Sequence, residues 1–292
     1  MKPSTENVPV MQCIITAWSF FANNIKTCYA YGVPFILTAA IGSWISLFVD
    51  ASSGLAGLAP ILYIMSLIFF VMMQGATYRL ALDLPKVGLG GLRLGDDEFR
   101  LLVVTVVVFL IAAFVAMVVA ILLMFLISPI LSSGIDPALL EESPELIFSQ
   151  SGGKVWLMLG LAAVFIWLVM FYLFARFAPA FPAAIAEKNI FIFEAAAWTK
   201  GQGLRIAFAS LIAFAPIYVL LAPELIMRIS VMPDIMAASS NGENVSAFSS
   251  EITAKLRSGF HWQILSILLA PALNAVRVGL FTTFLRGLRP SS

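Results

Sequence analysis

Three arginines and one asparagine are the side chains of this sequence whose types and spacing suggest chemistry, because they lie in or at the ends of long apolar segments. Arg79, Arg176 and Arg277 each come well past the middle of such a segment. Asn274 precedes Arg277 by three residues, which puts both on one helix face. An arginine inside a bilayer is costly and faces protein, water or phosphate, and its planar fork suits phosphate. We therefore interpret Arg79, Arg176, Arg277 and Asn274 as a candidate pocket for the anionic headgroup of a lipid.

A second interpretation of the same arginines needs no ligand. A long cationic side chain can extend to the membrane surface while its stem stays in apolar surroundings. The arginines could also pair with Asp83 or Glu187, the nearest carboxylates in the predicted loops. The sequence leaves both interpretations open.

Groups for catalysis or metal binding are scarce. The chain has a single histidine, His261, beside Trp262, and two cysteines, Cys13 and Cys28, without the spacing of a metal site. The loop 83–100 holds several glycines, but it does not match the phosphate-loop pattern and follows no strand. We expect no catalytic residue, no metal and no cofactor, and we expect Asp96 in that loop to cap the helix that follows.

The elements that position these residues are membrane helices. Hydrophobic residues make up 61% of the 292 residues, charged residues only 11%, and the mean hydropathy is +0.99. A soluble domain carries about 25% charged residues, so the surplus apolar surface must face lipid. A backbone in lipid must satisfy its own hydrogen bonds, which favours helices. The sequence predicts an all-α integral membrane protein, a single domain over 1–292, with six transmembrane helices over 30–49, 56–80, 101–131, 155–184, 204–223 and 260–287.

Two amphipathic segments are predicted to lie in the membrane interface, at 8–26 and about 189–200. In the first, apolar residues recur at helical spacing opposite a polar face. Trp18, Trp198 and Trp262 are expected to anchor helices at headgroup depth. The sequences Ala17-Trp18 and Ala197-Trp198 each precede a polar cluster and a proline-containing span, which suggests an internal repeat or a chance likeness of apolar stretches.

The distribution of positive charge predicts the topology. If the N-terminus is cytoplasmic, most of the Lys and Arg residues in the loops and termini are cytoplasmic too. The few on the opposite side of the membrane are Lys154, Arg228, Lys255 and Arg257. This bias fits the positive-inside rule and predicts that both termini are cytoplasmic. The net charge of +1 indicates no nucleic-acid partner.

Three segments resemble a known family. They are Ala17–Asn24 (AWSFFANN), Glu194–Gly201 (EAAAWTKG) and Leu92–Arg100 (LRLGDDEFR). Their order resembles the integral-membrane domain associated with bacterial glycerophosphodiester phosphodiesterases, and its stand-alone relatives. The resemblance implies a multi-pass protein of the bacterial inner (cytoplasmic) membrane. In that family the phosphodiesterase activity belongs to a separate soluble barrel, so no catalytic residue carries over.

The function that these observations favour is non-enzymatic. We expect an inner-membrane protein that binds anionic phospholipid, or that serves as an accessory or scaffold subunit for a membrane-protein partner or a homo-oligomer. A transporter or channel for a small or lipidic solute is the alternative, supported by the apparent repeat and the prolines in the later spans. A membrane enzyme acting on lipid is a third hypothesis, for which the sequence offers only His261 and the acidic run 96–98.

Overall fold

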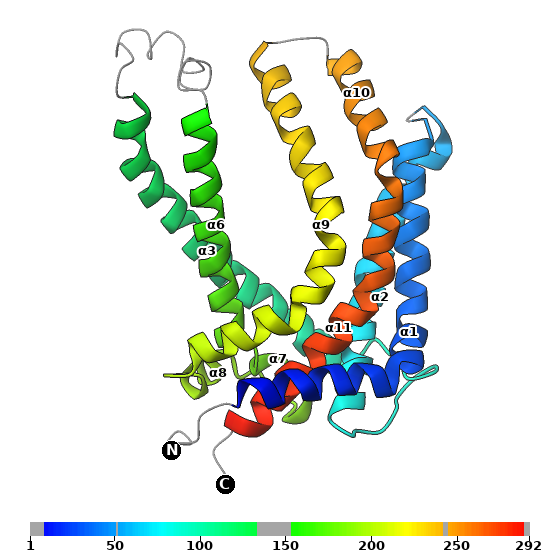
Figure 1. Cartoon of the computed structure of the whole chain (residues 1–292). Coiled ribbons are helices and arrows are strands. Elements are labelled where there is room, and N and C mark those ends of the chain that lie inside the picture. The colour runs from blue at the N-terminus through cyan, green and yellow to red at the C-terminus, as the bar shows by residue number, and fades with distance from the viewer. Residues whose placement is uncertain (1–8, 51, 133–152, 242–244, 289–292) are drawn as a thin grey trace.

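The structure is a computed structural model that describes residues 9–50, 52–132, 153–241 and 245–288. Within these ranges the fold is helical, and the one β-type contact is an isolated bridge between Leu89 and Leu92. Figure 1 shows the arrangement of the helices. They are α1 (Val10–Phe48), a 3₁₀ helix (Gly54–Gly57), α2 (Leu58–Ala81), α3 (Asp96–Ser132), α6 (Gly153–Phe177), α7 (Ala180–Ala186), α8 (Ile192–Trp198), α9 (Gly203–Asn241), α10 (Val245–Ser258) and α11 (Phe260–Leu288).

Six helices of the described part are long and apolar enough to cross a membrane: α1, α2, α3, α6, α9 and α11. Large apolar side chains stay exposed along them, among them Phe109, Phe114 and Phe125 on α3. Such a surface suits lipid and not water. The prediction of an all-α bundle with six membrane-spanning helices is confirmed.

α1 combines the predicted amphipathic segment with the first span. Asn24 has φ −118° and ψ 15°, which are not helical values, and the helix bends there. Figure 1 shows the part before Asn24 crossing beneath the bundle and the part after it running along the bundle. Cys13, Ile14 and Ala17 of the crossing part pack into the protein. Its exposed residues fall into an apolar set (Met11, Ile15, Ala22) and a polar set (Gln12, Thr16, Ser19, Asn23).

The region of α7 and α8 differs from the prediction in two details. The fourth apolar span continues to Ala186, in agreement with the predicted end at residue 184, but it is not one unbroken helix, because α6 ends at Phe177 and α7 is a separate short helix. Pro179 precedes α7 and lacks the N–H that a continuous helix would use there. The second interfacial helix is shorter than the predicted 189–200: α8 has seven residues. A turn with Gly201 at φ 79° follows it.

The fifth span is longer than predicted. The predicted span 204–223 stops at Pro223, yet α9 continues to Asn241 and α10 follows it. Glu224 and Arg228, just after Pro223, form an ion pair, with Arg228 Nη2 2.7 Å from Glu224 Oε1. This pair, one helical turn apart, supports the helix beyond Pro223. The segment 132–154, between the third and fourth predicted spans, lies almost entirely outside the described residues.

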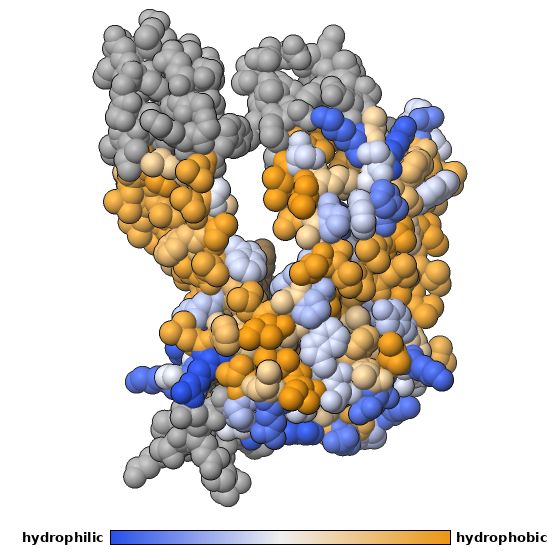
Figure 2. Space-filling view, viewed as in Figure 1, coloured by the Kyte–Doolittle hydropathy of each residue, from blue (hydrophilic) through white to orange (hydrophobic). Residues whose placement is uncertain are grey.

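The helices form two arms joined at one end. α3 packs on α6, while α1, α2, α9 and α11 pack together. Figure 1 shows the α3–α6 arm diverging from α9 and α11 with distance from α7 and α8. The space-filling view in Figure 2 shows a hollow between these arms with apolar side chains on both sides. We call this feature the inter-arm hollow, and we call the end that holds α7, α8 and the crossing part of α1 the basal end.

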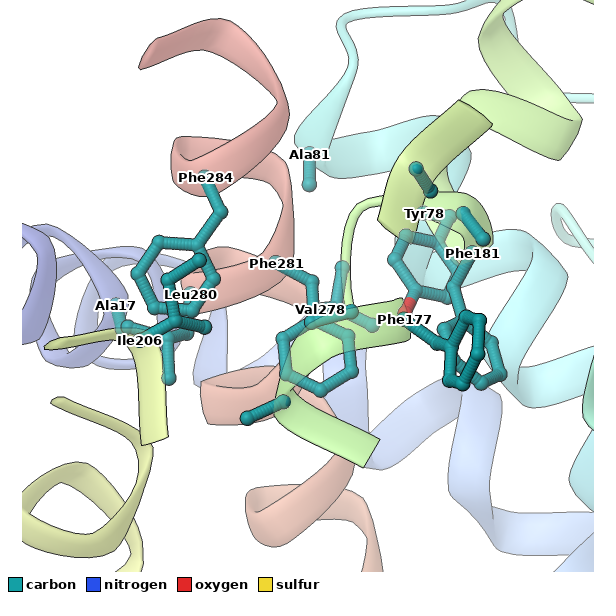
Figure 3. Packing of buried hydrophobic residues seen from close by; sticks show 14 of the residues in the cluster. Ala17, Tyr78, Ala81, Phe177, Phe181, Ile206, Val278, Leu280, Phe281 and Phe284 are labelled. Carbon is teal, nitrogen blue, oxygen red and sulfur yellow. The ribbon is translucent and has the colours of Figure 1, made fainter. Parts of the chain in front are cut away.

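The arms share one hydrophobic core at the basal end. Figure 3 shows part of it, with the rings of Phe181 on α7 and Phe281 on α11 5.8 Å apart. Every spanning helix contributes at least one buried residue to this core; they include Ala17, Tyr78, Leu101, Ala175, Ile206 and Phe284. The core therefore fixes the bases of both arms, and the hollow opens beyond it.

Candidate functional site

Arg79, near the end of α2, forms ion pairs with two carboxylates of α3. Its Nη1 contacts Glu98 Oε1 and lies 3.5 Å from Asp97 Oδ2. The side chains of Arg79 and Glu98 are only 4% and 0% exposed. The Arg79 Nη2 group also donates to the carbonyl of Gly91, at 3.3 Å. Arg79 is thus engaged inside the protein, by partners other than the carboxylates that the sequence suggested.

Gly75 makes room for this ion pair. It lies one turn before Arg79 on α2, and a Cβ atom at this position would lie 2.5 Å from Glu98 Oε1. The small residues Gly75 and Ala76 therefore form a packing position of α2, with Ala76 buried as well. The sequence held a signal for the pair: successive membrane-spanning helices run antiparallel, which brings the end of one level with the start of the next. That places Arg79 beside Glu98.

The residue that caps the N-terminus of α3 is not the one that the sequence predicts. Asp96 was predicted as the N-cap, but α3 begins with Asp96 itself, and Gly95 precedes it. Glu98 Oε2 accepts a hydrogen bond from the Gly95 N–H at 3.1 Å. A Glu at the third helical position bonding back to the cap N–H is half of a capping box. Glu98 therefore caps α3 with one oxygen and pairs with Arg79 through the other.

Arg176, at the end of α6, stabilises the end of α8. Its Nη2 donates to the carbonyl of Ala196. The Thr199 hydroxyl donates to the Arg176 carbonyl and to the Ala196 carbonyl, both at 3.0 Å. A cation near the C-terminus of a helix satisfies free carbonyls and complements the helix dipole. This geometry gives Arg176 a structural role at the basal end.

Arg277 belongs to a hydrogen-bonded network between α2 and α11. Its Nη2 donates to Asn274 Oδ1 at 2.9 Å. The Asn274 amide donates in turn to Thr77 Oγ1 at 3.2 Å, and the Thr77 hydroxyl donates to the Met73 carbonyl at 2.6 Å. Asn274 and Thr77 are buried, and Arg277 is half-buried. The network orients the guanidinium through a neutral amide, as the spacing of Asn274 and Arg277 predicts.

Arg277 has no carboxylate partner in the described part of the chain. Among the described residues, no Asp or Glu forms an ion pair with it, and its Nε is buried without a hydrogen-bond acceptor. Tyr78 on α2 and Tyr218 on α9 lie near enough to interact with the charge. Arg277 therefore differs from Arg79, which is paired with carboxylates. Arg176 resembles Arg277 in that none of the described Asp or Glu residues forms an ion pair with it and its Nε is buried without an acceptor, but its Nη2 group bonds a backbone carbonyl at the end of α8.

The three tryptophans predicted as anchors have contacts within the protein. The Trp18 indole N–H donates to the Ala213 carbonyl of α9, at 3.2 Å. Trp198 packs near Phe191 and Trp262 near His261, with ring centroids 6.0 and 4.8 Å apart. Trp18 thus joins the crossing part of α1 to α9, a role that periodicity alone does not reveal.

The chemistry that this arrangement offers is anion recognition. In the part of the chain that the structure describes, no group of three or more His, Cys, Asp or Glu side chains is placed to hold a metal ion. Cys13 and Cys28 are buried free thiols. Arg277 combines a positive charge, fixed orientation and spare N–H donors, which are the properties that bind a phosphate or carboxylate.

Comparisons with known proteins identify no relative. The chain matches no family model, no curated protein and no solved structure. The resemblance to the membrane domain associated with glycerophosphodiester phosphodiesterases thus stays a prediction from the three quoted segments.

Proposed function

We propose that this protein is a non-enzymatic, multi-pass inner-membrane protein that binds an anionic phospholipid. In this proposal Arg277 contacts the headgroup phosphate, and the inter-arm hollow holds the acyl chains. The observation that carries the proposal is a half-buried arginine in a membrane helix whose hydrogen-bond acceptor is the neutral side chain of Asn274. A charge at such a position is costly unless an opposite charge compensates it, and a lipid phosphate supplies that charge.

The level of Arg277 in the bundle supports a headgroup as the ligand. Gly279 of α11 packs against the crossing part of α1: a Cβ at Gly279 would lie 3.1 Å from Ala17 Cα and 3.2 Å from Phe20 Cβ. Arg277 is two residues away, or about 3 Å along the helix axis. If the crossing part lies in the interface, as its exposed apolar and polar faces favour, Arg277 is near headgroup depth.

The apolar surfaces of the inter-arm hollow favour a lipid over a free anion as the ligand. Large apolar side chains are exposed on the α3–α6 arm, among them Leu110, Leu161 and Phe165. α9 also exposes apolar side chains, including Val219 and Leu220, and Figure 2 shows apolar side chains on both sides of the hollow. Acyl chains contact such surfaces without exposing them to water. The proposal places the basal end and both termini in the cytoplasm, in accordance with the positive-inside rule.

Transport of an amphiphile is a second candidate that one observation favours. Because the described parts of the arms share a core at the basal end and diverge beyond it, a lipidic solute could enter between them from the bilayer. Flux of a fluorescent phospholipid between the leaflets of reconstituted vesicles distinguishes the two functions. A lipid-binding protein leaves the leaflet distribution unchanged, whereas a transporter alters it.

The test of lipid binding is the affinity of the full chain for phosphatidylglycerol, measured by native mass spectrometry in a neutral detergent. Arg277→Gln is compared with Arg205→Gln, which removes an exposed arginine of α9 near the same end. Loss of a charge-assisted contact costs about 1.5–3 kcal/mol, or about 10- to 100-fold in affinity. We expect that loss for Arg277→Gln and less than a twofold change for Arg205→Gln. Equal affinities in a folded Arg277→Gln protein would refute the proposal.

A further inference from the structure

A second cationic site lies at the basal end, separate from Arg277. A cavity of about 280 Å³ opens between the loop after α2, the start of α3 and the end of α7. It does not include Arg277, Asn274 or any residue of α9 or α11. Its charged lining consists of four cations (Arg79, Arg93, Arg100, Lys188) and two carboxylates (Asp96, Asp97).

Two of the four cations are already paired. Arg79 contacts Glu98 and Asp97, and Arg100 Nη1 lies 3.1 Å from Asp97 Oδ1. Asp97 is therefore shared between two arginines, and it does not compensate other charges in the cavity. Among the described residues, the carboxylate of the lining that forms no ion pair is Asp96, which is exposed at the start of α3.

Arg93 and Lys188 are the cations without an ion-pair partner in the described part of the chain. The Nε of Arg93 is buried and has no hydrogen-bond acceptor. Gly95 lets this side chain lie close to the backbone, since a Cβ there would be 2.5 Å from Arg93 Nε. Lys188 has φ 53°, a left-handed conformation that is strained for a residue with a side chain. Such strain is frequent at binding sites.

The loop that forms one wall is held in place. The Gly91 carbonyl accepts a hydrogen bond from buried Arg79, and Gly88 and Gly91 have φ of 83° and 98°, values that a residue with a side chain rarely adopts. A Cβ at Gly88 would also overlap the Leu92 carbonyl. The glycines of the sequence LPKVGLGGLRLG thus shape a rigid wall, and this loop was the distinctive polar segment to which the sequence assigned no ligand.

We infer that this cavity binds a phosphate group, carried by a small soluble molecule or by a lipid headgroup. Arg93 and Lys188 would be its direct contacts, because their charges are the uncompensated ones. The start of α3 adds partial positive charge from its free N–H groups. The inference is independent of the proposed function, since the two sites share no residue.

The experiment measures two probes on the full chain in phosphatidylcholine nanodiscs. Isothermal titration calorimetry with inorganic phosphate tests the soluble source, and native mass spectrometry with phosphatidic acid tests the lipid source. The test variant is Arg93→Gln with Lys188→Gln. The matched control is Lys200→Gln with Arg205→Gln, which removes two exposed cations of the same end outside the cavity.

We expect the test variant to weaken binding of at least one probe tenfold or more, and the control to change it less than twofold. The probe that responds identifies the source of the phosphate group. The inference is overturned if neither probe binds the wild-type chain, or if both variants lose affinity equally. If the test variant does not fold, Val87→Glu replaces it: this half-buried lining residue would place a carboxylate in the cavity, and unchanged binding of both probes would overturn the inference.

Discussion

Replacing Glu98 by glutamine should destabilise the protein far more than the same change at Glu224. Glu98 is fully buried and pairs with Arg79, whose side chain is 4% exposed. Removing one partner of a buried pair leaves the other charge without compensation and costs about 3–5 kcal/mol. Asp97, at 3.5 Å from Arg79, retains part of the attraction, so we expect the lower end of this range. Glu224 pairs with an Arg228 that is 54% exposed, and an exposed pair contributes about 0–1 kcal/mol.

The assay is the free energy of unfolding in mixed micelles, measured by denaturant titration with helical circular dichroism. Glutamine keeps an oxygen that accepts the Gly95 N–H bond, so the substitution isolates the charge. A third variant, Arg79→Met with Glu98→Leu, removes both charges and should be more stable than Glu98→Gln. If Glu98→Gln and Glu224→Gln lose the same stability, the buried pair does not join α2 to α3, and the reasoning fails.

Three further predictions use the same preparation. Gly75→Ala should lose about 1–3 kcal/mol of unfolding free energy because the new Cβ meets Glu98. Gly160→Ala, with open space around it, should gain up to about 1 kcal/mol. Equal effects of the two substitutions would contradict the close packing of Gly75 against Glu98. Thr199→Val removes a buried hydroxyl that bonds two carbonyls and should cost about 1 kcal/mol, seen as a lower denaturant midpoint; an unchanged midpoint would oppose this role. Cys13 and Cys28 are 2% and 1% exposed, so maleimide labelling of the folded chain should be slow and should become complete after denaturation, and rapid labelling in the native state would disagree.

The membrane fold could be predicted because its determinants are local in sequence. Twenty apolar residues in succession are sufficient to predict a span, and the periodicity of 8–26 predicted a helix with distinct faces. Errors occurred where tertiary contacts decide the boundaries. Pro179 ends α6, but Pro223 is tolerated inside α9, where Glu224 and Arg228 support the next turn. These two prolines cannot be told apart from the sequence, and the contacts that distinguish them come from the fold.

The contacts of the arginines also depend on the tertiary fold. The sequence identified Arg79, Arg176 and Arg277 as costly charges, which is a local property. Their partners come from other helices: Glu98 from α3 for Arg79, and Ala196 from α8 for Arg176. Only the Asn274 contact of Arg277 is local, one turn away on the same helix, and it is the contact that the spacing predicted.

The proposed function requires that Arg277 contacts the phosphate of an anionic phospholipid. A cryo-electron microscopy map of the full chain in nanodiscs that contain phosphatidylglycerol tests this contact, at a resolution that separates headgroup from acyl density. We expect a phosphate within about 3 Å of the Arg277 guanidinium, with acyl density in the inter-arm hollow. A map in which Arg277 contacts only Asn274 and protein groups, with no lipid density between the arms, would contradict it.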